Sequence, residues 1–513
     1  MTEDIRNTGD TGGSRDADDN QDAPLYLAID QGTHASRAVV LDGRARVLAQ
    51  GARDIGMVRP QADWAEQDGE EMVESIFAAA REALAALGAR RHRVVAAGLA
   101  SQRASCICWD RRDGRPLSPL FSWQDRRAHR WLRQFEPHAE DVHRKTGLFL
   151  SAHYGASKLR WALDNLPAVR AAREAGTLCW GPQASFLAFR LCAERPFLSD
   201  PQCAARTQLW NLRTRDWDPA LLGLFGLPEG FLPASVPTCH RYGTLRLGDA
   251  AIPLLALNGD QSAAVFAFGW PEEDAAYVNI GTSAFVQRAV AHDPGWVPRQ
   301  LTGIILDDGR TTLYTVEGNV NGAGTALEWL TAQPGLADAV ERLPQWLDDA
   351  EGASDAAGGD LPLFLNGIAG LGGPFWKPDF ASRFVAAGGG AGDAAGAPWQ
   401  RAVAVVESMA FLLQANIEEM AATLPPARRI RVSGGVSRFD GLCRRLAAIS
   451  GLPVHRRDDP EATARGIGYL AAGRPAQWNA AGAGEDVFAP VWDAALATRY
   501  RRWRLTMAEA TGI

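Results

Sequence analysis

Two short turns in the sequence pair a glycine with a threonine directly after an apolar run. Gly32 and Thr33 come soon after LYLAI, and Gly281 and Thr282 come directly after AAYVNI. Such turns aim backbone N–H groups and a hydroxyl at a phosphate chain with little side-chain bulk in the way. A third glycine turn, at residues 434–435, follows RIRVS. One such turn is ordinary turn chemistry, whereas three after apolar runs indicate a nucleotide phosphate site.

Two aspartates stand where apolar runs end. Asp30 ends the first run. Its carboxylate can hold Mg²⁺ there through water, because metal ions in phosphoryl transfer usually keep several bound waters. Asp260 follows IPLLALNG and should emerge at the C-terminal end of a strand, where α/β proteins place ligands. A carboxylate there can accept the proton of a hydroxyl that attacks phosphorus. The alternatives are a turn aspartate for Asp30 and a helix N-cap for Asp260.

Strands and helices that would position these residues alternate along the chain, which predicts an α/β fold. A strand–turn–strand–turn–strand pattern covers residues 25–54, and a second strand–turn–strand covers 275–290. Because both carry a Gly-Thr turn, we expect an internal duplication. Apolar residues at helical spacing predict the helices, which we place at residues 72–87, 158–166, 184–191, 405–420 and 462–472.

The bulk composition restricts the class of protein. The 513 residues are 46% hydrophobic and carry a net charge of −7, which disfavours nucleic acid or an anionic membrane as partner. We expect a cytoplasmic protein, because no signal peptide and no run of roughly 20 apolar residues is present. Seven scattered cysteines suit reduced thiols better than a disulfide framework. Residues 1–24 offer little to bury and predict a disordered leader.

Ten segments of the chain resemble, in order, motifs of the FGGY family of carbohydrate kinases, and most closely those of its glycerol kinase branch. The resemblance spans nearly the whole chain. The segments are LAIDQGTHASRAVVLD, WAEQD, GLASQRAS, FSWQDRR, SKLRW, NGDQSAA, IGTSAF, VEGNVNGAGTALEWL, GLGGPFW and RVSGGVS.

This resemblance implies two actin-like (ribonuclease H-like) ATPase domains around a central cleft. The acceptor pocket would lie in an N-terminal domain of residues 25–270, and the ATP site in a C-terminal domain of residues 271–475. Residues 476–513 would form a tail that packs on the domains. The activity implied is transfer of the γ-phosphate of ATP, with Mg²⁺, to a hydroxyl of a small sugar or polyol.

Carried over by position, the resemblance assigns Asp260 as general base and Asp30 as the residue that organises Mg²⁺. It places Arg103, Trp123, Gln261, Phe285 and His153 around the acceptor. It places Thr33, His34, Arg37, Thr282, Gly324, Glu328, Gly434 and Gly435 along the nucleotide.

The chain departs from the glycerol kinase motifs on the acceptor side. Ala104 follows Arg103 where those kinases have a glutamate, and His153 aligns with their tyrosine, although Tyr154 stands beside it. Loss of a hydroxyl-binding group redirects recognition. We therefore do not assign glycerol, since a longer polyol or a ketose fits a widened pocket at least as well.

Further departures fall on the nucleotide side. His34, Ser283 and Ser433 replace a threonine, a glycine and an aspartate of the usual turns, and Glu328 and Phe439 replace amide residues of the purine site. His34 can donate to a phosphate or point to solvent. These changes leave both essential carboxylates in place but leave the nucleotide preference open.

A non-catalytic actin-like protein that binds nucleotide and regulates or scaffolds is the alternative function. Such a protein would keep the glycine turns but has no need of Asp260 or of the acceptor residues. The kinase interpretation is therefore favoured. The expected partner is a small sugar or polyol, and the chain could also form a homo-oligomer. The acceptor, the hydroxyl phosphorylated and any allosteric control stay open.

Overall fold

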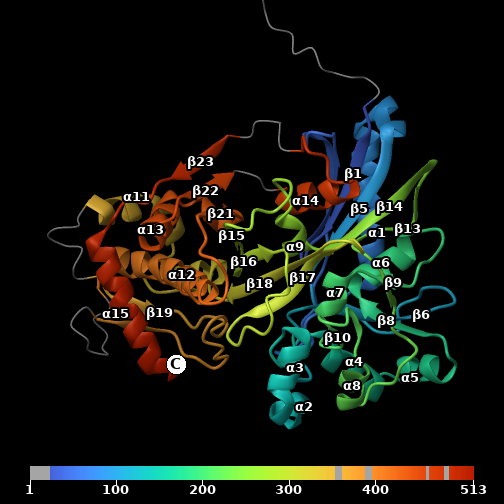
Figure 1. Cartoon of the computed structure of the whole chain (residues 1–513), viewed down its shortest axis with the longest axis horizontal. Helices are drawn as coiled ribbons and strands as arrows, with labels where there is room; N and C mark the ends of the chain where they lie inside the picture. Colours follow the sequence, from blue (N-terminus) through green and yellow to red (C-terminus); the bar gives the residue numbers. More distant parts are fainter. Residues whose placement is uncertain (1–22, 353–360, 387–395, 458–460, 479–483) are drawn as a thin grey trace, which may run out of the picture.

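Two twisted sheets organise the computed structural model, which describes residues 23–352, 361–386, 396–457, 461–478 and 484–513. The predicted leader therefore lies almost entirely outside the described residues. The first sheet has the order β13-β14-β5-β1-β2-β3 and the second β17-β18-β16-β15-β21-β22-β23 (Figure 1). The first comprises β1 (Leu25–Gln31), β2 (Ala35–Leu41), β3 (Val47–Asp54), β5 (Val94–Ser101), β13 (Cys239–Leu247) and β14 (Ala250–Gly259). The second comprises β15 (Ala275–Ile280), β16 (Ala284–Val290), β17 (Leu301–Asp307), β18 (Thr312–Val320), β21 (Arg429–Ser433), β22 (Val454–Arg457) and β23 (Glu485–Phe488).

The two sheets repeat one topology, which confirms the predicted duplication. In the first, β1, β2 and β3 form an antiparallel meander, β5 and β14 continue parallel to β1, and β13 closes antiparallel. In the second, β15, β16 and β18 form the meander, β21 and β22 run parallel to β15, and β23 closes antiparallel. Strand β17 is an addition at the meander edge.

Smaller sheets extend the first half of the chain and one loop of the second. A four-stranded sheet has the order β4-β7-β6-β8, and three further sheets have two strands each. These strands are β4 (Glu66–Gln67), β6 (Cys106–Asp110), β7 (Leu120–Phe121), β8 (Leu178–Pro182), β9 (Leu198–Ser199), β10 (Trp210–Asn211), β11 (Asp216–Trp217), β12 (Ala234–Ser235), β19 (Leu363–Leu365) and β20 (Arg383–Val385).

Helices cover both sheets, and the predicted helices are all present. The α-helices of the first half are α1 (Gly69–Ala86), α2 (His129–Leu132), α3 (Ala139–Thr146), α4 (Gly155–Asn165), α5 (Pro167–Glu174), α6 (Gln183–Leu191), α7 (Pro201–Ala205), α8 (Pro219–Leu224) and α9 (Asp260–Ala264). Those of the second half are α10 (Gly324–Thr331), α11 (Ala339–Gly352), α12 (Pro398–Ala421), α13 (Asp440–Ser450), α14 (Ala462–Ala471) and α15 (Ala494–Thr511). Short 3₁₀ helices cover Gly88–Arg93, Arg133–His138 and Gly435–Arg438.

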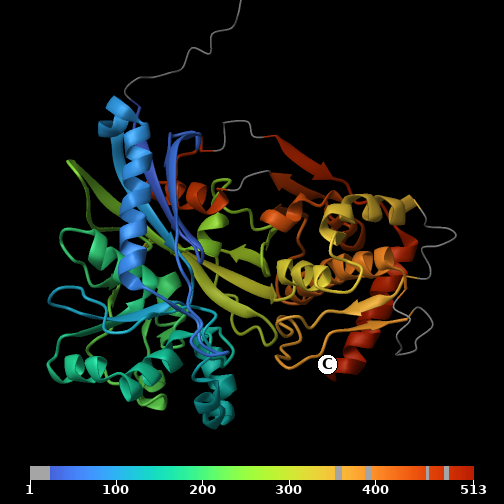
Figure 2. The same cartoon turned by 180° about the vertical axis from the view of Figure 1, so that it is seen from behind.

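Strand alternation decides which helix covers which face of the first sheet. Leu27 and Ile29 of β1 point to the layer of α1 and α6, whereas Ala28 between them points to the layer of α14. Figure 2 shows α1 running along the outer face of this sheet. The side-chain period of two thus gives each face its own core.

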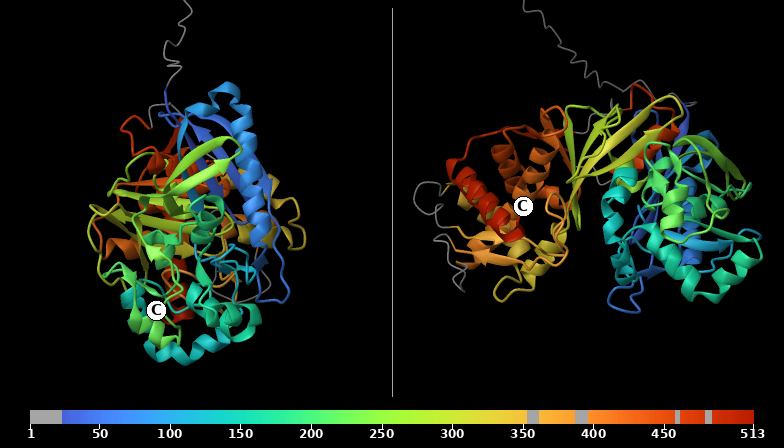
Figure 3. Two further views of the ribbon diagram at one scale, coloured as in Figure 1. Left: turned by 90° about the vertical axis from the view of Figure 1, so that its right-hand side faces the viewer. Right: turned by 60° about the horizontal axis from the view of Figure 1, so that its bottom comes forward.

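The inner layer belongs to both halves of the chain. It combines Ala28 and Ala263 with Tyr277 of the second sheet and with Ala464 and Ile467 of α14. Helix α14 packs on β1, β5, β14 and α9, although it falls within the predicted C-terminal domain of residues 271–475. Figure 3 shows the resulting two lobes. The division after residue 270 stays a prediction, with α14 lying against the first sheet.

The last helix, α15, packs against α13 and β19 of the second lobe. Its buried side chains include Tyr500, Trp503 and Met507, which join the largest apolar core. No helix in the described part of the chain is long and apolar enough to cross a membrane.

The contact between α14 and α9 supplies a test of the inner layer. A Cβ on Gly466 would lie 1.8 Å from the backbone oxygen of Ala263, so Gly466→Ala must push α14 away from α9. We expect a melting temperature several degrees lower and a reduced kcat, because α9 carries Asp260. Differential scanning fluorimetry and steady-state kinetics measure both. Gly223→Ala, where the added Cβ meets nothing within 4 Å, is the control and should be neutral or stabilising. Equal behaviour of the two variants would contradict the packing argument.

Candidate active site

Three parallel strands of the first sheet end at one level and deliver the predicted residues to one edge. The register pairs Gln31 with Ser101, and Ser101 with Gly259. Asp30 near the end of β1, Arg103 just after β5 and Asp260 just after β14 therefore lie side by side. The C-terminal edge of parallel strands is where α/β proteins bind ligands.

The second sheet presents its glycine turns in the same way. Asn279 of β15 lies opposite Ser433 of β21 and donates to its hydroxyl over 3.0 Å. The turn after β15 is closed by Gly281, whose N–H bonds to the Ser283 carbonyl. Gly434 has φ +91° and leaves no room for a Cβ against the Ile280 carbonyl, so only glycine fits there. The two turns therefore lie next to each other with their backbones exposed.

Burial raises the pKa of both Asp30 and Asp260. Burial, together with the nearby Asp260 carboxylate, raises the pKa of Asp30 to about 7, and Arg37 only partly opposes this. Burial also raises the pKa of Asp260, against the guanidinium of Arg103. Two carboxylates with raised pKa values at one strand edge are typical of an active site rather than of a structural ion pair.

The geometry around Asp260 does not match the N-cap alternative. The N-cap of α9 is Gly259, and Asp260 is the first helical residue, whose Oδ1 accepts the N–H of Gln261 at 2.7 Å. Gly259 instead gives room to Arg103, whose Cγ would lie 2.5 Å from an added Cβ. The Arg103 side chain therefore passes directly beside the strand that carries Asp260.

A buried ion cluster joins the two halves behind this edge. Glu317 of β18 accepts Arg103 Nη1 at 2.6 Å, Arg206 Nη2 at 2.9 Å and Gln287 Nε2 at 2.6 Å. Burial alone would raise the pKa of Glu317, but the two guanidiniums outweigh it and hold the pKa at about 2. The Arg103 guanidinium also lies 5.2 Å from the ring centroid of Phe285. Arg103 and Phe285 thus meet across the two sheets, as the predicted acceptor pocket requires.

Trp123 connects the acceptor side to the first phosphate turn. Its indole Nε1 donates to Thr33 Oγ1 at 3.1 Å, and its carbonyl oxygen lies 2.9 Å from His153 Nδ1. Burial lowers the pKa of His153 to about 4, so the ring is neutral at pH 7. Tyr154 lies next to the ion cluster, since Arg206, Glu317 and Arg103 all influence its pKa. Both residues that compete for the tyrosine position therefore lie close to other predicted acceptor residues, His153 to Trp123 and Tyr154 to Arg103.

The predicted nucleotide residues differ in whether they could offer a nucleotide their backbone or their side chain. Thr282, Gly434 and Gly435 are exposed at the strand edge, and the side chains of His34, Arg37 and, in α10, Glu328 are exposed as well. Gly324 begins α10 with its N–H bonded to the Gly281 carbonyl at 2.9 Å, and its missing side chain makes room for that turn. Gly324 therefore supports the phosphate turn, whereas among the described residues Glu328 shows no polar side-chain contact that ties it to the others.

Three charged residues that the sequence prediction did not single out complete the site. Glu317 and Arg206 belong to the ion cluster, and Lys158 is fully buried next to the loops that carry the predicted residues Arg103 and Trp123. A glutamate inside the apolar run LYTVEGNV was the available signal, because a charge in a buried strand needs partners. Which arginines would pair with it depends on contacts between residues more than 100 positions apart.

The carboxylates present fit a magnesium ion. Mg²⁺ is usually bound by one or two carboxylates, with waters and phosphate oxygens completing the shell. Asp30 offers one carboxylate at the strand edge, with Asp260 close enough to raise its pKa. Within the described ranges no group of three or more His, Cys, Asp or Glu side chains forms a metal site.

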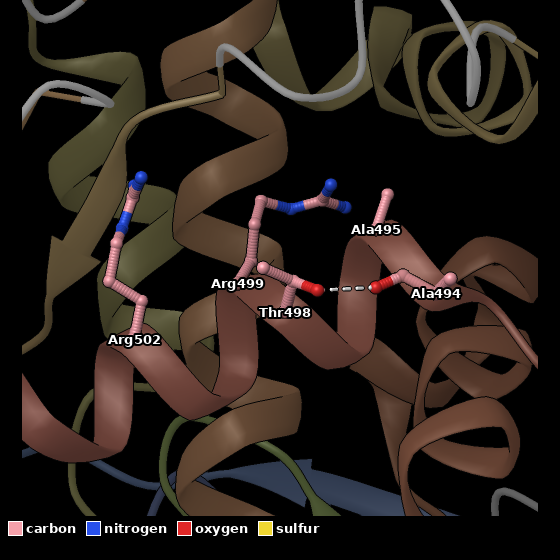
Figure 4. Close-up of a pocket in the computed structure, with 5 residues that line it drawn as sticks. All are labelled: Ala494, Ala495, Thr498, Arg499 and Arg502. Atoms are coloured by element: carbon pink, nitrogen blue, oxygen red, sulfur yellow. Dashed lines mark hydrogen bonds between the residues drawn. The ribbon is translucent and has the colours of Figure 1, made fainter.

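A separate cavity of about 320 Å³ lies on α15, away from the predicted residues. Figure 4 shows its lining, in which Thr498 donates to the Ala494 carbonyl. Arg499 already binds Glu407, and Arg502 donates to the Leu361 carbonyl. The cavity contains none of the predicted site residues.

Comparison with known proteins places most of the chain beside one family. Residues 25–267 match the model of the FGGY family of carbohydrate kinases, N-terminal domain, and residues 276–473 match that of the C-terminal domain. A glycerol kinase of Polaromonas naphthalenivorans (strain CJ2) is 33% identical over 87% of this chain and 89% of its own. One from Alkalilimnicola ehrlichii (strain ATCC BAA-1101 / DSM 17681 / MLHE-1) is 35% identical over the same shares.

Solved structures show the same two-domain fold. A Plasmodium falciparum glycerol kinase with ADP superposes with a TM-score of 0.84 at 21% identity, covering 96% of this chain and 99% of its own. A gluconate kinase from Lactobacillus acidophilus superposes with a TM-score of 0.80 at 22% identity, covering 95% and 98%. The predicted pair of actin-like α/β domains is thereby confirmed.

Removing the charge of Glu317 should destabilise the protein and weaken acceptor binding. Glu317→Gln leaves two buried guanidiniums without their carboxylate, which costs about 3 kcal/mol for a buried pair. Denaturant unfolding and the acceptor KM measure the two effects. Glu140→Gln, which breaks only an exposed pair with Arg144, is the control. Unchanged stability in Glu317→Gln would show that the cluster is not needed to join the halves.

The raised pKa of Asp30 predicts a pH-dependent stability in the ligand-free protein. The folded pKa of about 7 exceeds the ordinary 3.8, so the folded protein keeps a proton that the unfolded chain releases. Wild-type stability should therefore fall as pH rises from about 4 to about 7. Asp30→Asn removes this loss, so its melting temperature should exceed that of the wild type by several degrees at pH 8 and by little at pH 4. The exposed change Asp249→Asn is the control, and an equal difference at both pH values would refute the shift.

Proposed function

The chain belongs to the FGGY family of carbohydrate kinases, and we propose that it phosphorylates a sugar or polyol longer than glycerol with Asp260 as general base. It is an ATP-dependent phosphotransferase with an alcohol group as acceptor. The observation that carries the proposal is the position of Asp260 beside Asp30 and Arg103 at one strand edge. The Gly-Thr turns of both sheets give the phosphates their contacts.

Transfer proceeds in line between a substrate hydroxyl and the γ-phosphorus. Asp260 takes the hydroxyl proton as the oxygen attacks, the new O–P bond forms, and the bond to the bridging β–γ oxygen breaks to release ADP. Burial raises the pKa of Asp260, which makes its carboxylate a stronger base, while Arg103 keeps it from being protonated too readily. No phosphoenzyme is needed.

Asp30 would hold Mg²⁺ through water at the end of β1. When bound, the ion neutralises charge on the β- and γ-phosphates. Thr33 and Arg37 stand on the same strand–turn–strand unit, and Thr282, Gly434 and Gly435 stand on the facing turns. These groups supply hydroxyl, guanidinium and N–H donors for the phosphates.

The acceptor side supports a substrate with more hydroxyls than glycerol. Ala104 is only half-buried, and its methyl group takes up less room next to Arg103 than the glutamate of the glycerol kinases would. Arg103, Gln261 and Tyr154 offer polar groups, and Trp123 and Phe285 offer ring faces for sugar carbons. A pentose-derived polyol, a ketose or a sugar acid uses more of these groups than a three-carbon polyol does. The non-catalytic alternative has no support in the comparisons.

A coupled assay of ADP release tests both parts of the proposal. The panel contains glycerol, erythritol, ribitol, xylitol, ribulose, xylulose, gluconate and sedoheptulose, each with Mg²⁺-ATP. We expect the highest kcat/KM for an acceptor with at least four carbons. In Asp260→Asn, kcat should fall by about 10²-fold or more, because the base is lost, while ATP affinity stays within about twofold.

The surface variant Asp249→Asn is the control for expression and charge, and should keep wild-type rates. Highest kcat/KM for glycerol would refute the acceptor class. Equal loss of ATP affinity and turnover in Asp260→Asn would refute the general-base role. No acceptor-dependent turnover with any substrate would refute the proposed function.

A further inference from the structure

Lys158 is a fully buried lysine that none of the predicted roles uses. It lies in the first turn of α4, and its exposed fraction is 0%. A buried ammonium loses its hydration, and its charge is unfavourable near the positive N-terminal end of a helix. A group kept at such a cost needs strong compensating contacts.

Those contacts are three backbone carbonyls on three separate loops. Lys158 Nζ donates to the oxygens of Ser122 at 2.7 Å, His153 at 2.7 Å and Ala104 at 3.1 Å. An ammonium has three N–H donors, so every donor is used. No carboxylate takes part in these three bonds.

Each carbonyl belongs to a loop that carries an acceptor-side residue. Ala104 follows Arg103 and has a left-handed backbone φ of +62°. A residue other than glycine rarely adopts this conformation unless surrounding contacts support it. Ser122 precedes Trp123, whose N–H is held by Ser105 Oγ at 2.9 Å. His153 is itself an acceptor-side residue and precedes Tyr154. One ammonium thus binds His153 itself and the residues next to Arg103, Trp123 and Tyr154.

We propose that Lys158 is a positioning residue that holds the three acceptor loops in register by binding their carbonyls. This inference rests on the proposed function for the identity of those loops as the acceptor side. The ammonium does not touch the acceptor. It acts through the loops that carry Arg103, Trp123 and His153.

Charge supports the assignment and makes it sensitive to pH. Burial lowers the pKa of Lys158 to about 8, while Cys106 and Asp125 oppose this effect and Arg127 adds to it. The Cys106 thiol beside it has its pKa raised by burial to about 11, and the pKa of His153 is held near 4. Lys158 is therefore the group of this cluster that changes charge near pH 8. Above that pH the amine keeps only two N–H donors and one carbonyl loses its bond.

The kinetic test separates the acceptor from ATP. In Lys158→Met, which keeps the volume but removes the donors, the acceptor KM should rise by about tenfold or more, while the ATP KM stays within about twofold. In the wild type, the acceptor KM should rise as pH passes about 8, and this rise should be absent in Lys158→Met. Arg160→Met, on the exposed face of the same helix, is the control and should match the wild type.

Hydrogen exchange tests the same inference without an acceptor, and without a variant if Lys158→Met fails to fold. When the wild type is moved from pH 7 to pH 9.5, amides in residues 102–105, 122–124 and 151–155 should lose protection, so that their exchange rates rise more than the intrinsic rate of an unprotected amide does. The turns at 281–283 and 434–435 are the internal control and should keep their protection. Unchanged protection of the three loops would overturn the positioning role. Absence of turnover with every acceptor, beside the expected exchange, would instead refute the proposed function alone.

Discussion

The two halves of this kinase meet through a carboxylate that is buried between guanidiniums. Glu317 comes from the second sheet, whereas Arg103 and Arg206 come from the first half of the chain. Such a group is stable only when all its partners are present, because an unpaired charge in the interior costs several kcal/mol. The cluster therefore fixes both Arg103, a predicted acceptor residue, and the relation of the two sheets in a single interaction.

The site depends on the register of the strands as much as on their residues. Gln31, Ser101 and Gly259 share one level in three parallel strands. Asp30 stands directly before that level at the end of β1, whereas Arg103 and Asp260 follow it just beyond β5 and β14. A shift of one residue would turn Asp260 toward the opposite face of the sheet. The close contact of Gly466 in α14 with α9 fixes the position of α9, and therefore of Asp260, from the other side of the shared core.

Two polar groups beside the predicted acceptor residues are satisfied by backbone carbonyls, whereas Arg103 is satisfied by the opposite charge of Glu317. Lys158 binds three carbonyls, and His153 binds the Trp123 carbonyl. Backbone contacts fix loop shape and do not depend on which side chains the loops carry. A pocket built in this way can change acceptor through single substitutions, such as an alanine at position 104, while its framework stays the same. This explains how the chain can keep the framework of the FGGY family while its predicted acceptor residues differ from those of the glycerol kinases.

The sequence determined the local features: the strand–turn–strand units, the helices, the Gly-Thr turns and the motifs that identify the family. These follow from side-chain period and turn chemistry, which act over a few residues, so the positions of Asp30 and Asp260 at strand ends could be predicted from the residues around them. The roles of Glu317, Arg206 and Lys158, in contrast, become apparent only in the tertiary structure. Their roles arise from contacts between distant segments, and a charged residue in a sequence does not say which partner will bury it. The packing of α14 on the first sheet, across the predicted boundary, could not be predicted for the same reason.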